Sequence, residues 1–217
     1  AELLSYEGPF GVGYGVAAFT PSGKDEKRHY DQILLGEEEK KTQERRSHED
    51  AYLRLARASL EYFVLNGKTL PKPEGLPPEM ENERAGVFVS IKKFGHLRGC
   101  IGTISPAQAS IALEIIHNAV SAGTEDPRFD AVHEDELPDL VYDVDILGRP
   151  EKIASMAELD PKHYGVIVSC NGRRGLLLPD LEGIDTPQKQ VRIALDKAGI
   201  DEDESYSMQR FKVTRHE

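Results

Sequence analysis

The chain has 217 residues, charged side chains at 30% of its positions and a formal net charge of -11. This length suits one domain of ordinary size, or one domain with an appendage. The negative charge argues against general affinity for nucleic acid or anionic membranes, because both require clustered Lys and Arg. No apolar run approaches the length of a membrane span, and the two cysteines have no regular spacing, so we expect a cytoplasmic protein with reduced thiols.

The first 46 residues predict a strand and a linker. Val12, Tyr14 and Val16 alternate with glycine or alanine, which is typical of a strand packed tightly on one side. The glycines around them lack the Gly-x-Gly-x-x-Gly spacing of a dinucleotide-binding loop. Residues 21–46 carry many charges of both signs, so we expect a solvated linker that is partly helical. Since the sequence opens directly in an apolar, glycine-rich segment, we expect it to be part of a longer protein.

Periodicity then predicts alternating helices and strands. A 3.6-residue period, with capping residues at its ends, predicts helices between Ser47 and Gly67, between Ser105 and Gly123, and between Thr186 and Gly199. A two-residue period predicts strands at residues 85–92, 96–104, 137–147, 165–170, 175–178 and 206–214. Several strands are joined by short turns, and such hairpins imply antiparallel pairing. We therefore expect an α+β domain, mainly an antiparallel sheet with flanking helices, from about residue 47 to the end.

The stretch HLRGCIGTI at residues 96–104 is the first candidate site. Two glycines flank a cysteine inside a predicted strand, which indicates a close approach of backbone or ligand. Strand alternation places Arg98 and Cys100 on one face, and a cation beside a thiol favours the reactive thiolate. The alternative is that Cys100 is a small buried hydrophobe, as free cysteines often are.

Three polar groups further along the chain have two interpretations each. Asp126 and Arg128 straddle a proline in a stiff loop, which is either a binding loop or a turn held by a local ion pair. Asp143 and Asp145 lie two apart on a strand and could bind a cation, but we favour a solvated sheet face. Arg173 and Arg174, beside the Asn-Gly turn, either meet an anionic ligand or are exposed turn arginines.

The run LRGCIGT at residues 97–103 resembles the signature of the AMMECR family, a widespread group of cytoplasmic proteins with no established biochemical activity. Three further motifs are similar and come in the same order: DPRF at residues 126–129, ELP at residues 136–138, and GLLLP at residues 175–179. The resemblance covers residues 47–217. It implies an α+β fold of two subdomains with a groove at the signature.

The resemblance also implies which residues form the site. Cys100 and Arg98 are the candidate catalytic residues. The candidate ligand-binding residues are Gly99, Gly102, Thr103, Asp126, Arg128 and Phe129. No metal ligand is expected among them.

The segment YEGPFGVGY at residues 6–14 resembles the C-terminal end of a class III extradiol dioxygenase domain of the LigB and Memo type. Such a domain is fused ahead of an AMMECR domain in some bacteria, often accompanied by a radical-SAM protein. The resemblance implies a dioxygenase-like remnant at residues 1–20, a charged linker at 21–46 and an AMMECR-like domain at 47–217. Iron would be bound in the absent part of the dioxygenase-like domain, so no cofactor is expected in this chain.

Three functions fit these observations. The first is that the domain binds or acts on a small ligand in a groove next to Cys100, within a radical-SAM-associated modification pathway, with enzyme status open. The second is a non-catalytic scaffold for the fused dioxygenase-like domain and a radical-SAM partner. The third is a nucleic-acid-associated regulatory role, which the acidic charge places last.

Overall fold

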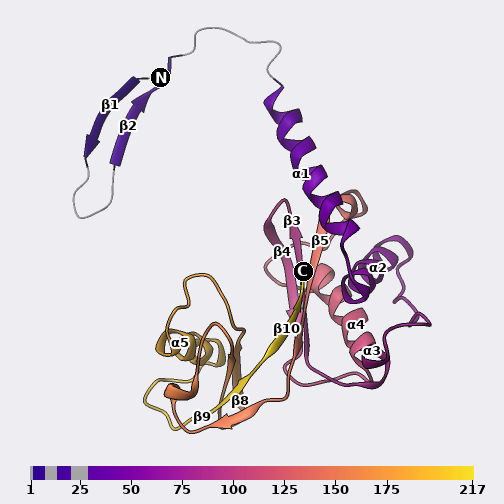
Figure 1. The fold of residues 1–217 in the computed structure, drawn as a ribbon, viewed down its shortest axis with the longest axis vertical. Coiled ribbons are helices and arrows are strands. Elements are labelled where there is room, and N and C mark those ends of the chain that lie inside the picture. Colours follow the sequence, from indigo (N-terminus) through magenta and orange to yellow (C-terminus); the bar gives the residue numbers. More distant parts are fainter. Residues whose placement is uncertain (1, 8–13, 21–28) are drawn as a thin grey trace. The chain divides into compact units, whose positions relative to one another are not determined.

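The computed structural model describes residues 2–7, 14–20 and 29–217, and the chain divides into two compact units, residues 1–37 and 38–217. In the first unit, β1 (Glu2–Glu7) and β2 (Tyr14–Ala18) form an antiparallel hairpin (Figure 1). The predicted strand is confirmed from Tyr14 onward, whereas residues 8–13, which include most of the YEGPFGVGY motif, lie outside the described residues. The partner strand β1 was not predicted, because its register shifts between Leu3 and Ser5 and the alternation breaks there.

Two helices run through the predicted linker and the start of the predicted domain. The helix α1 (Tyr30–Ser47) confirms that the linker is partly helical, and α2 (Ala51–Asn66) ends as predicted at Gly67, in a left-handed conformation. The predicted cap was wrong, because Ser47 ends α1. Asp50 caps α2 instead, with its carboxylate accepting the backbone N–H groups of Tyr52 at 2.9 Å and Leu53 at 3.0 Å.

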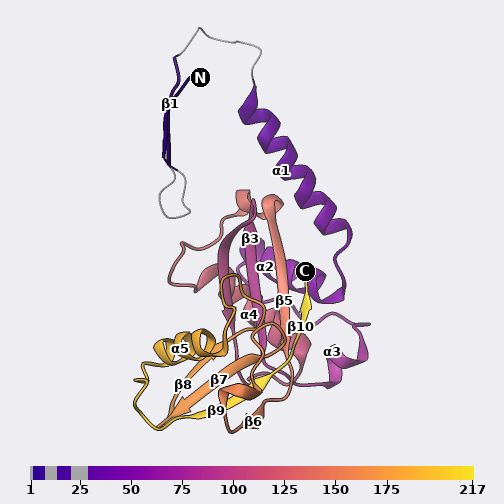
Figure 2. The same cartoon turned by 60° about the vertical axis from the view of Figure 1, so that its left-hand side comes forward.

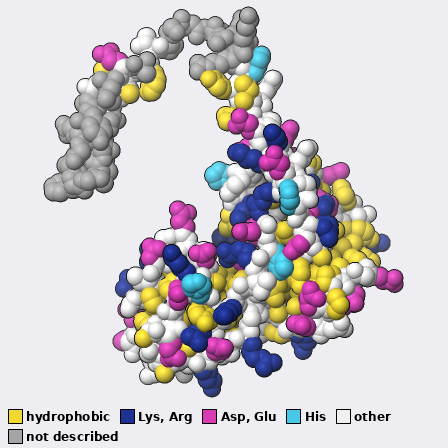
Figure 3. All heavy atoms as spheres, viewed as in Figure 1, with side chains coloured by type: hydrophobic (Ala, Val, Ile, Leu, Met, Phe, Trp, Pro, Cys, Tyr) yellow, Lys and Arg dark blue, Asp and Glu magenta, His cyan; other side chains and the backbone are white. Residues whose placement is uncertain are grey.

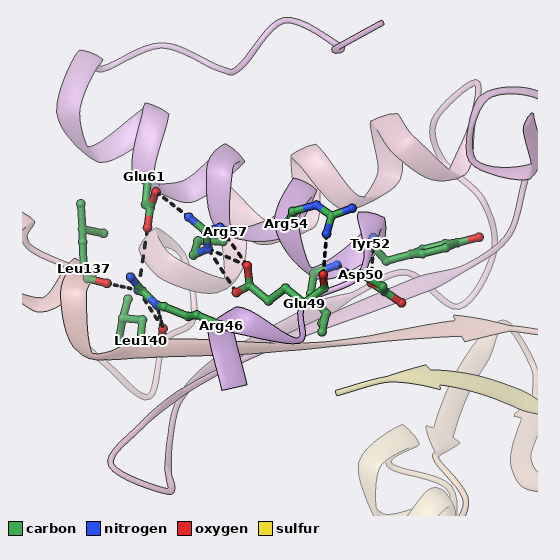
Figure 4. Close-up of polar contacts among 10 residues, drawn as sticks. Arg46, Glu49, Asp50, Tyr52, Arg54, Arg57, Glu61, Leu137 and Leu140 are labelled. Carbon is green, nitrogen blue, oxygen red and sulfur yellow. Dashed lines mark hydrogen bonds and ion pairs between the residues drawn. The ribbon is translucent and has the colours of Figure 1, made fainter. Parts of the chain in front are cut away.

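Arginines hold the last turn of α1 and the start of α2 in the second unit (Figure 4). The Arg46 guanidinium donates to the carbonyl oxygen of Leu140 at 2.9 Å and also to that of Leu137. Arg57 pairs with the buried Glu49 carboxylate at 2.8 Å. Buried charges persist in folded proteins when they are paired in this way, so this end of the charged segment forms part of the packed domain.

The first large sheet has the strand order β10-β5-β3-β4. Its antiparallel strands are β3 (Val87–Lys93), β4 (His96–Gly102), β5 (Leu140–Leu147) and β10 (Val213–His216). The turn between β3 and β4 is the predicted one, with positive φ angles at Phe94 and Gly95. The helices α2 and α4 (Ile111–Thr124) cover one face of this sheet, and the short α3 (Pro78–Asn82) packs against α4 (Figure 2). The largest hydrophobic core of the chain lies between these helices and the sheet.

The start of α4 differs from the prediction. Ser110 caps this helix, five residues beyond Ser105. The buried Glu114 carboxylate accepts the backbone N–H groups of Ala107 at 3.0 Å and Gln108 at 2.7 Å. These bonds stabilise the preceding segment as a loop, so Ser105 and Pro106 cannot begin the helix.

The second sheet has the order β6-β9-β7-β8. Its strands are β6 (Glu151–Ile153), β7 (Gly165–Cys170), β8 (Arg173–Leu177) and β9 (Ser207–Phe211). The helix α5 (Pro187–Ala198) packs on β7 and β8, and it confirms Thr186 as the predicted cap. The predicted strand at 137–147 begins only at Leu140, because the 3-10 helix η2 (Glu134–Asp139) precedes it, and a second 3-10 helix, η3 (Met156–Glu158), lies after β6.

The two sheets are joined by the end of the chain. The predicted last strand, residues 206–214, is two strands that belong to different sheets, β9 in the second and β10 in the first. A small apolar cluster that includes Ile167, Leu176 and Phe211 packs where the sheets approach each other. The predicted α+β class with two subdomains is confirmed. In the part of the chain that the structure describes, no helix is both long and apolar enough to cross a membrane.

Candidate functional site

A cavity of about 520 Å³ lies between the two sheets. The first sheet contributes the side of β3 that faces away from α2 and α4, because Phe88, Ser90 and Lys92 line the cavity while the intervening residues enter the core. The second sheet contributes the strand β8 and the leucines that follow it. The volume is in the range of pockets that bind small molecules.

Polar residues form a row across three strands of the cavity wall. Ser90 on β3 pairs with Cys100 on β4 and with Asp143 on β5, and all three line the cavity. The Ser90 hydroxyl donates a hydrogen bond to the Cys100 sulfur at 3.2 Å. The structure therefore places a thiol, a hydroxyl and a carboxylate side by side on one surface.

The two aspartates of β5 are buried, so the prediction of a solvated sheet face was wrong. Asp143 is 7% exposed and pairs with Lys92 and with Arg45 at 2.8 Å. Asp145 is 5% exposed and pairs with Arg215 at 2.8 Å. The second subdomain covers this face, and the cations balance the charges that become buried.

Arg98 does not lie beside the thiol. The partner of Ile91 is Gly99 and that of Lys92 is Leu97, so Arg98 is the extra residue of a β-bulge. Its guanidinium pairs with Glu136 at 2.8 Å. Strict alternation, on which the prediction rested, fails at this bulge.

The predicted activation of Cys100 was also wrong. Burial raises the pKa of the Cys100 thiol, and the opposing effects of the Ser90 hydrogen bond and the Arg128 charge do not reverse this shift. At neutral pH the cavity therefore contains a protonated thiol, which is a weak hydrogen-bond donor and not an activated nucleophile.

The two glycines of the signature serve close packing. A Cβ atom on Gly99 would clash with the carbonyl oxygen of Ala122 in α4, and one on Gly102 would clash with the ring of Phe88. Gly102 lines the cavity, whereas Gly99 faces the helix. Thr103 also lies outside the cavity lining, and its hydroxyl donates to Glu114 at 2.6 Å.

The predicted loop lies along the outer edge of β4, the last strand of the first sheet, and outside the cavity lining. Asp126 accepts the backbone N–H of Cys100 at 2.8 Å and pairs with Arg128 at 2.7 Å. The guanidinium groups of Arg98 and Arg128 lie 6.0 and 5.4 Å from the ring centre of Phe129. The structure thus separates the predicted residues into two groups. Cys100 and Gly102 line the cavity, and the charged residues with Phe129 support the strand that carries the thiol.

Sequence reasoning missed much of the cavity wall. The second subdomain contributes Leu176, Leu178 and Lys197, which are more than 70 residues from Cys100 in the chain, together with Arg174, for which contact with an anionic ligand was one of the two predicted roles. The GLLLP motif was the available signal, since it contains both leucines, but nothing in it indicated a cavity. Within the described ranges, no three His, Cys, Asp or Glu side chains are placed to hold a metal ion.

The ion pairs Arg98–Glu136 and Arg128–Asp126 predict that the folded protein becomes less stable at acid pH. The hydrogen bonds from Arg98 lower the pKa of Glu136 from 4.5 to about 2, and Arg128 holds the pKa of Asp126 far below its usual range. A carboxyl group with a lowered folded-state pKa contributes stability above its unfolded pKa, and this contribution is lost as the pH falls toward the folded value. We expect the urea midpoint to fall steadily from about pH 5 to about pH 2.

Substitution of Glu136 should make that decline shallower. Glu136→Gln removes one of the two titrating groups, so the midpoint should depend less on pH, although the variant is less stable at neutral pH. Glu134→Gln, an exposed position on the same 3-10 turn, serves as the matched control. An identical pH profile for wild type and Glu136→Gln would contradict this expectation.

Comparison with known proteins agrees with this architecture. The AMMECR1 family model matches residues 53–217. Protein CA_C1420 of Clostridium acetobutylicum is 49% identical over 218 residues, which cover 99% of this chain and 46% of that protein. A protein of Thermotoga maritima is 50% identical over 170 residues, which cover 77% of this chain and 98% of that protein. This chain thus spans about half the length of the first relative and nearly all of the second.

A solved structure shows the same fold. The uncharacterized protein PH0010 from Pyrococcus horikoshii superposes with a TM-score of 0.69 at 29% sequence identity, covering 76% of this chain and 88% of that chain. The family match spans the helices that cover the first sheet from Leu53 onward, both large sheets and the cavity between them. The chain belongs to the AMMECR1 family.

Proposed function

We propose that this AMMECR1-type domain binds a small organic ligand in the cavity beside Cys100. The observation that supports the proposal is the composition of the wall, where the row of Cys100, Ser90 and Asp143 faces a surface of leucines across about 520 Å³. Small-molecule sites combine a mostly apolar wall with a few convergent polar groups in this way. The protonated thiol acts as a contact for the ligand.

We propose that this ligand binding is one step of a modification pathway that also involves a dioxygenase-like domain and a radical-SAM protein. Cys100 is the residue through which the domain would take part in chemistry, after a ligand or partner removes the thiol proton. Burial raises the pKa of the Cys100 thiol, and this direction supports binding as the primary role. Whether the domain turns over its ligand would be read from product formation by the wild type and Cys100→Ser.

A fragment screen with the full chain tests the binding proposal. Ligand-observed NMR should detect small molecules that bind the wild type and lose at least about tenfold in affinity in Cys100→Phe, because the larger side chain fills the cavity. Leu65→Phe is the matched control, since Leu65 is an exposed residue on α2. Fragments that bind both variants as they bind the wild type would contradict the proposal.

A second candidate is a scaffold for a dioxygenase-like domain. More than half of the Clostridium relative lies outside the matched region, so that protein has room for a further domain. Such a scaffold should associate with the separately produced remainder of the relative at micromolar concentration, and with a radical-SAM partner. The absence of association in analytical ultracentrifugation would contradict it.

A nucleic-acid role is the third candidate and the least supported, because the acidic charge of the chain opposes phosphate binding. Figure 3 shows basic and acidic side chains interspersed over the visible face of the second unit, and the net charge is -11. A phosphate-binding protein would show affinity that falls steeply as salt is added. We expect no such salt-dependent binding in a filter or anisotropy assay.

A further inference from the structure

We propose that the cavity beside Cys100 takes an organic anion, a carboxylate or phosphate ester with an apolar body. This inference rests on the proposed function, because it specifies the ligand of the same cavity. It comes from an imbalance among the charged side chains of the wall, where two of the cations are left without a carboxylate.

The cavity wall contains four basic side chains, and two of them are already neutralised. Lys92 pairs with Asp143, and Arg215 pairs with Asp145. The other two are Arg174 and Lys197, and neither lies within 4.0 Å of a carboxylate oxygen in the part of the chain that the structure describes.

Arg174 keeps most of its hydrogen-bonding capacity for a ligand. Its guanidinium donates to the Ser105 hydroxyl at 3.1 Å. A guanidinium has five N–H donors in a planar fork that matches the oxygens of a carboxylate or phosphate. The hydrogen bond to the neutral Ser105 hydroxyl orients the guanidinium group and leaves its positive charge uncompensated.

Arg174 and Lys197 are both exposed, and they belong to neighbouring elements of the second subdomain, β8 and α5. Arg174 directly precedes Gly175, and Gly175 has no Cβ, so the last turns of α5 pack closely against it. Lys197 is in the last turn of that helix. Ser105, which Arg174 contacts, follows β4, the strand that carries Cys100.

Glu217 is the acidic residue of the wall for which the described part of the chain contains no ion-pair partner. Glu217 follows β10 and acts electrostatically on Arg215, which is at the opposite edge of the first sheet from β4. The cavity therefore has a basic end where Arg174 contacts Ser105, just after the strand that carries Cys100. A chain with a net charge of -11 repels anions in general, so this basic end provides a local attraction.

The apolar side chains in the rest of the cavity wall favour a ligand whose remaining part is apolar. Phe88, Ile104, Leu176, Leu178 and Leu181 all line the cavity. Low-polarity walls also strengthen the attraction between a cation and a bound anion, because they displace water. A purely inorganic anion would leave these side chains without contacts.

Cys100 offers a direct test, because it reports on reagents that enter the cavity. Iodoacetate is an anion and iodoacetamide is neutral, and the two have nearly the same size. In each reaction a bond forms between the Cys100 sulfur and carbon as the carbon–iodine bond breaks, iodide leaves and the thiol proton passes to water. Rates are measured on the full chain at about pH 8.5, with peptide mapping to separate Cys100 from Cys170.

The measured quantity is the ratio of the iodoacetate rate to the iodoacetamide rate at Cys100. We expect the double variant Arg174→Glu/Lys197→Glu to lower this ratio on the order of tenfold. Added salt should lower the wild-type ratio toward that of the variant. The control Lys152→Glu/Lys189→Glu makes the same charge change at exposed positions outside the cavity and should keep the wild-type ratio.

The outcomes separate this inference from the proposed function. An iodoacetamide rate close to that of the wild type shows that a variant is folded with its cavity open, because unfolding would expose Cys100 and raise the rate. An unchanged ratio in the double variant, with both reagents still reacting, would overturn the anion proposal and leave a cavity for neutral ligands. If neither reagent alkylated Cys100 in the folded wild type even above the raised pKa of the thiol, the cavity would be closed to small molecules, and the proposed function would fail with it.

Discussion

Gly99→Ala should destabilise the domain by about 3 kcal/mol or more. The added Cβ would overlap the carbonyl oxygen of Ala122, so β4 and α4 would have to separate in the middle of the main hydrophobic core. Backbone atoms cannot rotate away as a flexible side chain can, which makes this site intolerant of even one methyl group. Urea unfolding followed by circular dichroism measures the loss.

Gly36→Ala is the matched control for that experiment. Gly36 is a helical glycine with no atom close to the position of an added Cβ. Alanine is the better helix former, so this variant should be as stable as the wild type or slightly more stable. Equal stability of Gly99→Ala and the wild type would show that β4 and α4 do not pack as described.

Asp126→Asn should have the second large effect, a loss of about 3 kcal/mol. The Asp126 carboxylate is 4% exposed, and it binds both the Cys100 N–H and the Arg128 guanidinium. An amide at this position cannot neutralise the arginine, and it presents an N–H group where the carboxylate presented an acceptor. The Cys100 amide should then exchange with solvent deuterium faster than in the wild type.

Asp160→Asn provides the comparison for this variant. Asp160 Oδ2 lies 2.7 Å from His163 Nδ1, within hydrogen-bond distance, but both side chains are exposed. Exposed pairs contribute at most about 1 kcal/mol, so this change should be small. If the two variants lost the same stability, Asp126 would not support the strand that carries the thiol.

Local patterns predicted most elements of the fold. Gly67, the turn at Phe94 and Gly95, and Thr186 were each identified from residue types that a cap or a turn requires. The misplaced start of α4 has a different cause. Ser105 and Pro106 have the right residue types, but the buried Glu114 carboxylate binds the loop after them, and such a contact is not visible in a local pattern.

The candidate site was predicted only in part, also for physical reasons. Cys100 was correctly placed on the face away from the helices, because strand alternation holds at that residue. Arg98 was misplaced because a β-bulge changes the face of a side chain without a clear sequence signal. Arg174 was named as a possible contact for an anion, but the sequence did not connect it or the other residues of β8 and α5 with Cys100, since only the tertiary fold brings them to the same cavity.

Amide mapping by NMR tests the central claim, that the cavity beside Cys100 is the ligand site. A small organic anion that binds the full chain, such as phenyl phosphate, should shift the amide resonances of Ser90, Cys100, Gly102 and Leu176, which come from both walls. Shifts confined to the outer edge of β4, around Arg128 and Phe129, would contradict the account.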